Sequence, residues 1–99
     1  MAEHPLAPIM RLDPSLMDHL NAADDLIYED GALSRKVKLL IAMAFDAARG
    51  AAEGVKALAQ AALREGATKE EIAEAIRVAY QLSGVGSVYT AAAGLKDLV

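Results

Sequence analysis

The sequence contains no cysteine among its 99 residues. Disulfide bonds, thiolate nucleophiles and thiolate metal ligands are therefore excluded, because each of them requires a cysteine sulfur. The chain also has no tryptophan and only one phenylalanine. Much of its apolar content is alanine instead, which favours helix and lets helices approach one another closely.

The sequence has no excess of basic residues and no long hydrophobic run. Its formal net charge is −4, and its lysines and arginines are scattered, whereas a nucleic-acid partner requires a basic stripe. The longest strongly apolar run, Leu39 to Phe45, is far shorter than the roughly 20 residues needed to span a bilayer. Met1 to Leu12 lacks the charged-then-apolar pattern of a secretory signal. We therefore expect a cytoplasmic protein that binds neither nucleic acid nor membrane.

The apolar fraction is high for so short a chain. Apolar residues make up 55% of the sequence, above the usual share for soluble domains. A chain of this length forms one domain, and a small domain cannot bury all of its apolar surface by itself. Because contiguous apolar surface usually marks an interface, the composition predicts a homo-oligomer.

The distribution of apolar residues predicts an all-α fold of about five helices. No stretch alternates with a period of two between turn signals, as strands would. Helical periodicity, capping residues and glycine stops instead predict helices over about residues 13–30, 34–50, 51–65, 68–83 and 87–98. Asp13 is a good N-cap for the first helix, the second begins at Ser34, and Thr68 and Glu71 form a capping box at the start of the fourth. Residues 1–11 lack periodicity and are predicted to be a partly ordered lead-in, so the domain spans residues 12–99.

The predicted helix 34–50 is apolar nearly all round. One face carries six apolar residues: Val37, Leu40, Ile41, Ala44, Phe45 and Ala48. Leu39, Ala42 and Met43 cover much of the opposite side. Such a helix is buried on most sides, which predicts a central helix flanked by a partner subunit. Asp46 lies within this helix and is expected to pair with Arg49 or another cation.

Four segments of the chain carry a family resemblance. They are Gly31 to Lys36, the apolar helix to Gly50, the junction Glu65-Gly66-Ala67-Thr68-Lys69-Glu70-Glu71-Ile72, and Tyr89 to Ala92. Together they resemble the carboxymuconolactone decarboxylase family, which includes the AhpD-like alkylhydroperoxidases. The resemblance covers most of the chain from Leu12 onward. It implies an all-helical subunit that assembles into intertwined dimers, trimers or hexamers.

The resemblance also implies where the chemistry of the AhpD-like branch would lie. That branch carries a Cys-x-x-Cys-x-x-x-His segment at the start of the third helix and a glutamate on the preceding helix. In this chain the two cysteine positions fall on Ala51 and Gly54, the histidine position on Leu58, and the glutamate position on Leu39. None of these four side chains can ionise or attack a peroxide. Thiol-dependent alkylhydroperoxidase activity is therefore predicted to be absent, and lactone decarboxylation is in doubt because it also uses the histidine.

The polar residues that remain offer weak catalytic candidates: Glu53, Asp46 and His19. Glu53 is explained by a favourable interaction with the dipole of its helix. His19 lies off the apolar stripe of its helix, and neither it nor His4 has a second ligand at metal-binding spacing. No metal and no cofactor are predicted. Ser87 is expected to cap the last helix rather than act as a nucleophile, since no histidine is placed to activate it.

The sequence therefore predicts an AhpD-like homo-oligomer that serves as a binding or structural module. A retained family pocket would be lined by Leu39, Ala51, Gly54, Val55 and Leu58, and would suit a small apolar ligand. The alternative is a lactone decarboxylase-like enzyme, or another lyase, using acid–base residues contributed across a subunit interface. A third possibility is that the chain is the small partner of a larger, active homologue.

Overall fold

The computed structural model describes residues 4–99, and within this range it consists of six helices and no strands. The helices are α1 (Ala7–Leu12), α2 (Pro14–Tyr28), α3 (Arg35–Ala48), α4 (Ala52–Arg64), α5 (Lys69–Ser83) and α6 (Gly86–Leu95). The predicted all-α class is confirmed. Helix α1 is additional to the five predicted helices. It lies within the predicted lead-in, has a proline in its first turn, and is too short to show helical periodicity in sequence.

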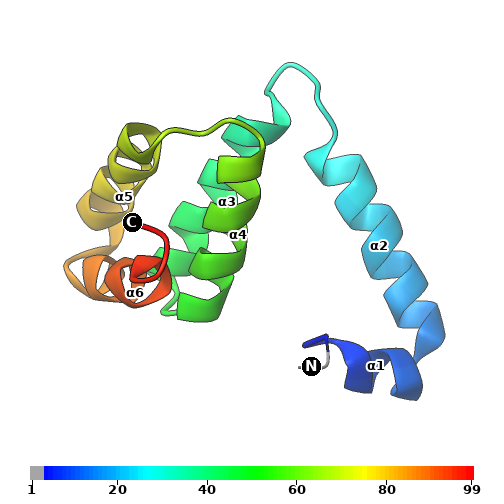
Figure 1. Ribbon diagram of the computed structural model, residues 1–99. Helices are drawn as coiled ribbons and strands as arrows, with labels where there is room; N and C mark the ends of the chain where they lie inside the picture. Colours follow the sequence, from blue (N-terminus) through cyan, green and yellow to red (C-terminus); the bar gives the residue numbers. More distant parts are fainter. Residues whose placement is uncertain (1–3) are drawn as a thin grey trace.

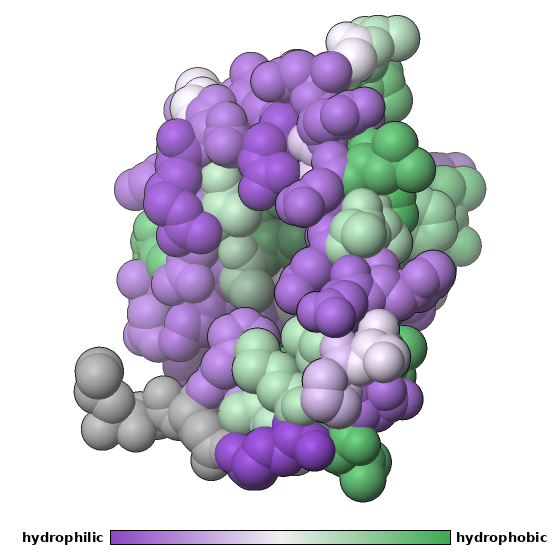
Figure 2. Space-filling view, turned by 90° about the vertical axis from the view of Figure 1, so that its right-hand side faces the viewer, coloured by the Kyte–Doolittle hydropathy of each residue, from purple (hydrophilic) through white to green (hydrophobic). Residues whose placement is uncertain are grey.

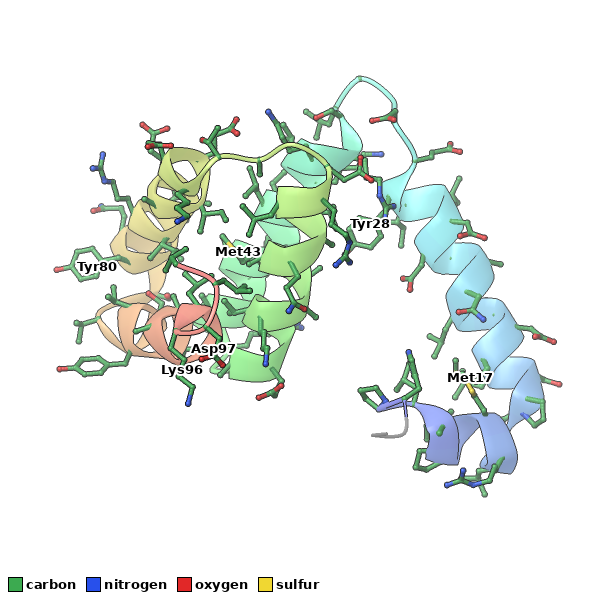
Figure 3. The ribbon with its side chains drawn as sticks, in the orientation of Figure 1. Met17, Tyr28, Met43, Tyr80, Lys96 and Asp97 are labelled. Atoms are coloured by element: carbon green, nitrogen blue, oxygen red, sulfur yellow. The ribbon has the colours of Figure 1, made fainter. Side chains whose placement is uncertain are left out.

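The six helices divide into a body and an arm (Figure 1). The body consists of α3 to α6, with α3 and α4 side by side and α5 and α6 packed across them. The arm consists of α1 and α2, and it extends away from the body on the side opposite α5. Met17, labelled in Figure 3, is the one buried residue described in α2. Within residues 4–99, the two arm helices therefore pack mainly on each other, and the main contact of α2 with the body is at α3.

The beginnings of α2, α3 and α5 follow the predicted capping residues. The side chain of Asp13 accepts a hydrogen bond from the backbone N–H of Leu16, and Ser34 Oγ accepts one from Val37. Such bonds satisfy N–H groups that lack a partner within the helix. Among the helix starts, the prediction for Ser87 is wrong. It lies inside α6, where its buried hydroxyl donates to the carbonyl of Gly84 at 2.7 Å.

The core of the body forms around one face of α3. Leu39, Met43 and Ala47 are the buried residues of this helix, and Met43 has no exposed surface. The main core cluster joins Met43 and Ala47 to buried residues of the other body helices: Val55, Ala59, Ile72, Ala79, Ala91 and Leu95. The six apolar residues predicted to share a face of α3 lie outside this buried set. They are the subject of the next subsection.

Gly94 allows α6 to cross α4 at close range. A Cβ atom added to Gly94 would lie 2.6 Å from the backbone carbonyl oxygen of Ala52 and 2.8 Å from Val55 Cβ. Neither position leaves room for a methyl group, because backbone and branched side chains cannot move aside easily. This crossing fixes α6 against the first turn of α4.

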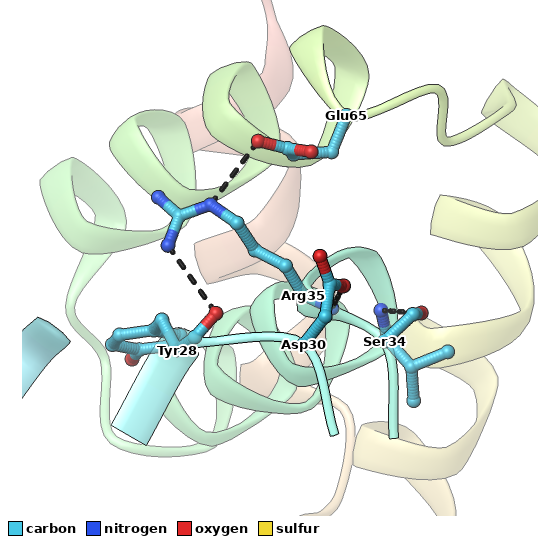
Figure 4. Close-up of polar contacts among 6 residues, drawn as sticks. Tyr28, Asp30, Ser34, Arg35 and Glu65 are labelled. Carbon is cyan, nitrogen blue, oxygen red and sulfur yellow. Dashed lines mark hydrogen bonds and ion pairs between the residues drawn. The ribbon is translucent and has the colours of Figure 1, made fainter. Parts of the chain in front are cut away.

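The arm is fixed to the body by polar contacts around Arg35 (Figure 4). The guanidinium of Arg35 forms an ion pair with Glu65 at 3.1 Å, donates to the carbonyl oxygen of Tyr28 and lies 5.9 Å from the Tyr28 ring centroid. The backbone N–H of Arg35 donates to Asp30 Oδ1 at 2.7 Å, and Lys38 Nζ donates to the carbonyl oxygen of Glu29. These contacts set the direction in which α2 leaves the body. We call them the Arg35 latch.

None of the helices described for residues 4–99 is both long enough and apolar enough to cross a membrane.

The start of α5 generates a prediction about pH. The predicted capping box is present: the Thr68 hydroxyl accepts from the N–H of Glu71, and the Glu71 carboxylate accepts from the N–H of Thr68. The Thr68 N–H and then the Lys36 ammonium, 2.9 Å from the other carboxylate oxygen, hold the pKa of Glu71 below its usual value of 4.5. Because the pKa is lowered on folding, the carboxylate stabilises the fold above about pH 4.5, and this contribution is lost as the pH falls through the folded-state pKa.

We therefore expect Glu71→Gln to lower the denaturant midpoint at pH 7, and the difference from the unsubstituted protein to shrink toward pH 3. Chemical denaturation followed by circular dichroism measures both midpoints. Glu70→Gln, which removes the same charge one residue away, is the control. A difference between Glu71→Gln and the unsubstituted protein that is equal at pH 7 and pH 3 would contradict the prediction.

Candidate functional site

The head of α4 is where the family resemblance places reactive groups. Ala51 is the N-cap residue and provides no side-chain capping bond, while its N–H donates to the carbonyl oxygen of Asp46 at 2.9 Å. Gly50 precedes it with a φ of +79°, a conformation that glycine adopts without strain. The chain therefore turns tightly from α3 into α4, and this turn brings the end of α3 against the first turn of α4.

The side chain of Asp46 fills the space beside Gly54. A Cβ atom on residue 54 would lie 2.8 Å from Asp46 Cγ and would overlap the carboxylate oxygen Oδ2. The carboxylate also forms an ion pair with Arg49, as predicted, and its side chain is only 13% exposed while that of Arg49 is 71% exposed. Gly54 therefore gives the room that Asp46 occupies. The carboxylate lies at the position where any larger side chain of residue 54 would begin.

The other residues predicted to line a family pocket pack inside the subunit. Leu39 and Val55 are 3% and 0% exposed and belong to the two core clusters, and Leu58 packs against both clusters. The side chains of Leu39, Val55 and Leu58 thus form part of the core on the side of α3 that faces α4. A ligand pocket lined by these residues stays a prediction.

A different cavity lies on the other side of α3. It is a surface groove of about 340 Å³ between α3 and α5. We call it the apolar groove, and its lining residues are Val37, Leu40, Ile41, Ala44, Phe45, Ala48, Ala75, Val78, Ala79 and Leu82. All ten are apolar, and several are well exposed, including Phe45 at 65% and Leu82 at 81%. The groove therefore presents hydrocarbon to its surroundings with no ionisable group in its lining.

Figure 2 shows the molecule from the side on which α2 lies. The face that it shows is largely hydrophilic, and hydrophobic residues gather along its right-hand edge. Six of the ten groove residues had been recognised in sequence as one face of the helix over residues 34–50. The α5 half of the groove was missed. Its signal is the spacing of Ala75, Val78, Ala79 and Leu82, which places all four on one side of a helix.

The three weak catalytic candidates do not converge. Glu53 is exposed in the first turn of α4, His19 is exposed on α2, and Asp46 is paired with Arg49. Across residues 4–99 no group of three or more histidine, aspartate or glutamate side chains is arranged to hold a metal ion. Tyr80 points outward from α5 (Figure 3) and is 51% exposed. The structure thus brings none of the candidates to the apolar groove.

Comparison with known proteins identifies the family. The model of the carboxymuconolactone decarboxylase family matches residues 14–97. A protein from Paracoccus denitrificans, named "Uncharacterized protein 4 in cox locus", is 34% identical over 84 residues, which cover 85% of this chain and 75% of that protein. The crystal structure of the apo form of a carboxymuconolactone decarboxylase family protein from Legionella pneumophila has a TM-score of 0.85 at 32% identity, covering 92% of this chain and 81% of the other. The chain belongs to the carboxymuconolactone decarboxylase family, and the resemblance drawn from its sequence is confirmed.

The contact between Asp46 and Gly54 generates a prediction about stability. Alanine normally stabilises a helix interior by about 1 kcal/mol relative to glycine. Here we expect Gly54→Ala to destabilise the protein by about 1–3 kcal/mol, because the new methyl group displaces the Asp46 carboxylate. In an Asp46→Ala background the same substitution should be neutral or stabilising.

Chemical denaturation of the four proteins in this double-mutant cycle measures the coupling. Gly86→Ala is a matched control, because a Cβ atom at that position meets no atom within 4 Å. Additive effects of Asp46→Ala and Gly54→Ala, within about 0.5 kcal/mol, would show that the two residues do not compete for this space.

Proposed function

We propose that this protein is a homo-oligomeric binding or structural module of the carboxymuconolactone decarboxylase family, and that it has no thiol peroxidase activity. The observation that carries the proposal is the apolar groove. An uncovered groove lined by ten apolar side chains is suited to bind another apolar surface, because burial removes that hydrocarbon from water. The cytoplasmic location expected from the sequence belongs to the same proposal.

The head of α4 supports the absence of peroxidase chemistry. Peroxide reduction by this branch of the family needs a thiolate, and the thiolate is the nucleophile in such reactions. The chain has no cysteine, and the residues at the two cysteine positions are Ala51 and Gly54. The neighbouring Asp46 carboxylate is held by Arg49. Residues without a reactive side chain, Ala51 and Gly54, therefore stand at the start of α4 where this branch of the family carries its thiols.

The alternative of a lyase using acid–base residues has less support. General acid–base catalysis requires a side chain within hydrogen-bond reach of the reacting group. Glu53 lies on the exposed surface of α4 and His19 on that of the arm, and the lining of the apolar groove contains neither of them. The lyase alternative would need residues from a neighbouring subunit to complete a site.

We expect the purified protein to reduce no alkyl hydroperoxide at the expense of a dithiol reductant above the rate of a buffer blank. A coupled assay of peroxide consumption measures this rate, with a thiol-dependent alkylhydroperoxidase as the positive control. Turnover that depends on both the protein and the dithiol would contradict the proposal.

We expect the protein to be an oligomer in solution, because its exposed large apolar residues lie on both the arm and the body. Size-exclusion chromatography with light scattering gives the mass directly. A mass equal to the 10.4 kDa monomer at micromolar concentrations would contradict the proposal. A mass that is a whole multiple of 10.4 kDa would also show that the chain assembles without a larger homologous partner.

A further inference from the structure

We infer that a surface pocket between α5 and α6 binds a short aliphatic chain that ends in a carboxylate, and that Lys96 meets the carboxylate. This pocket is separate from the apolar groove and from the head of α4. Three features support such a ligand: the apolar lining of the pocket, its length along α6, and one lysine at its edge whose charge has no partner within residues 4–99.

The pocket offers hydrocarbon to a ligand over most of its surface. It has a volume of about 330 Å³, at the lower end of the range for small-molecule sites. Six of its seven lining residues are apolar: Ile76, Val88, Ala91, Ala92, Leu95 and Val99. Ala91 and Leu95 are 2% and 6% exposed and form the floor, whereas Val88 and Ala92 are exposed at its sides. Methylene groups placed here would be removed from water, which favours binding.

Helix α6 sets the length of the pocket. Its lining residues from Val88 to Leu95 recur at intervals of three and four, so they follow one side of the helix. These seven residue steps extend about 10 Å along the helix axis. An unbranched chain of about eight carbon atoms, with bonds near 1.5 Å, is of similar length. The pocket therefore suits an unbranched chain that lies along α6.

Lys96 is the one residue of this lining with an ionisable side chain. It is the C-cap residue of α6, and its side chain extends outward from the end of that helix (Figure 3). A lysine in this position packs its methylene stem against apolar neighbours and keeps its ammonium group in water. Asp97, the next residue, does not belong to the lining. The ammonium group thus lies at the edge of the hydrocarbon, where the head group of a bound chain would emerge.

The charge of Lys96 is available to a ligand. Within residues 4–99 its side chain forms no hydrogen bond and no ion pair. By contrast, Arg35, Lys36 and Arg49 are each paired with a carboxylate of the chain. An ammonium group without a partner can bind a carboxylate without breaking an internal contact, and it favours an anionic head group over a neutral or cationic one.

The apolar groove lacks a group of this kind. Its lining contains no ionisable side chain, so it offers no charged contact that would orient a ligand. Sites for small molecules usually combine an apolar lining with a few polar groups that fix the orientation of the ligand. The pocket between α5 and α6 has this combination, whereas the groove is suited to another apolar surface.

Titration with sodium octanoate, followed by NMR of the isotope-labelled protein, locates the site. We expect the largest shifts of backbone amides at Val88, Ala92 and Leu95, and small shifts at Ala44 and Phe45 of the groove. Octan-1-ol should bind about fivefold more weakly than octanoate, because it lacks the charge that Lys96 attracts. Hexanoate should bind about tenfold more weakly, because it buries two fewer methylene groups.

Two matched pairs of variants test the roles of the lysine and of the pocket. Lys96→Met should weaken octanoate binding about fivefold and leave octan-1-ol binding unchanged. Lys56→Met, which removes the same charge outside the lining, should change neither. Ala92→Leu should fill the pocket and weaken both ligands at least about tenfold. Ala93→Leu, which alters the next exposed residue of α6 outside the lining, should change neither.

Three results would overturn the inference. The first is the absence of amide shifts at millimolar octanoate, and the second is a set of shifts centred on the groove. The third is a Lys96→Met protein that binds octanoate as tightly as before but has a lower denaturant midpoint, since the lysine would then act only on the dipole of α6. An oligomer that binds no octanoate would leave the proposed self-assembly standing, and a monomer that binds octanoate at this pocket would leave the ligand site standing.

Discussion

The structure depends on burial of one face of α3. Met43 has no exposed surface, and it and Ala47 contact residues from α4, α5 and α6 in a single core. In a chain of 99 residues with one phenylalanine and no tryptophan, this core is built from aliphatic side chains and close helix crossings such as the one at Gly94. The same helix is apolar on its remaining side, and that side becomes the groove. One helix therefore serves both the fold of the subunit and the surface through which we propose that it binds.

The head of α4 keeps the family fold in a chain that has no cysteine. The positions that carry reactive groups in the AhpD-like branch hold Ala51, Gly54, Leu58 and Leu39 in this chain. Two of these residues have joined the core or its edge as hydrocarbon, and the space beside Gly54 holds Asp46. The Asp46 carboxylate can therefore occupy this space only because residue 54 is glycine. A cysteine introduced at residue 54 alone would meet the Asp46 side chain.

The features that were predictable from the sequence are those formed by residues close together in the chain. The caps made by Asp13 and Ser34 and the capping box of Thr68 and Glu71 each span three residues, so sequence spacing determines them. The pairing of Asp46 with Arg49 is of the same kind. The groove was not predictable, since it requires knowing that α5 lies beside α3. The contact of Asp46 with Gly54 depends equally on how α4 folds back. The prediction that Ser87 caps the last helix was wrong, because its buried hydroxyl donates a hydrogen bond to the carbonyl oxygen of Gly84 instead.

The Arg35 latch has a consequence for the symmetry of any assembly. A hinge that rotates freely would let an arm reach any neighbour, and such subunits can link head to tail without limit. Here Asp30, Glu65 and Tyr28 hold the hinge through one arginine and fix the angle at which α2 departs. A fixed angle permits only a few ways for copies to meet, and it reduces the ordering entropy lost on association. In any self-assembly through the arm, the latch would therefore hold neighbouring copies in one relative orientation, and that orientation would determine whether the assembly closes.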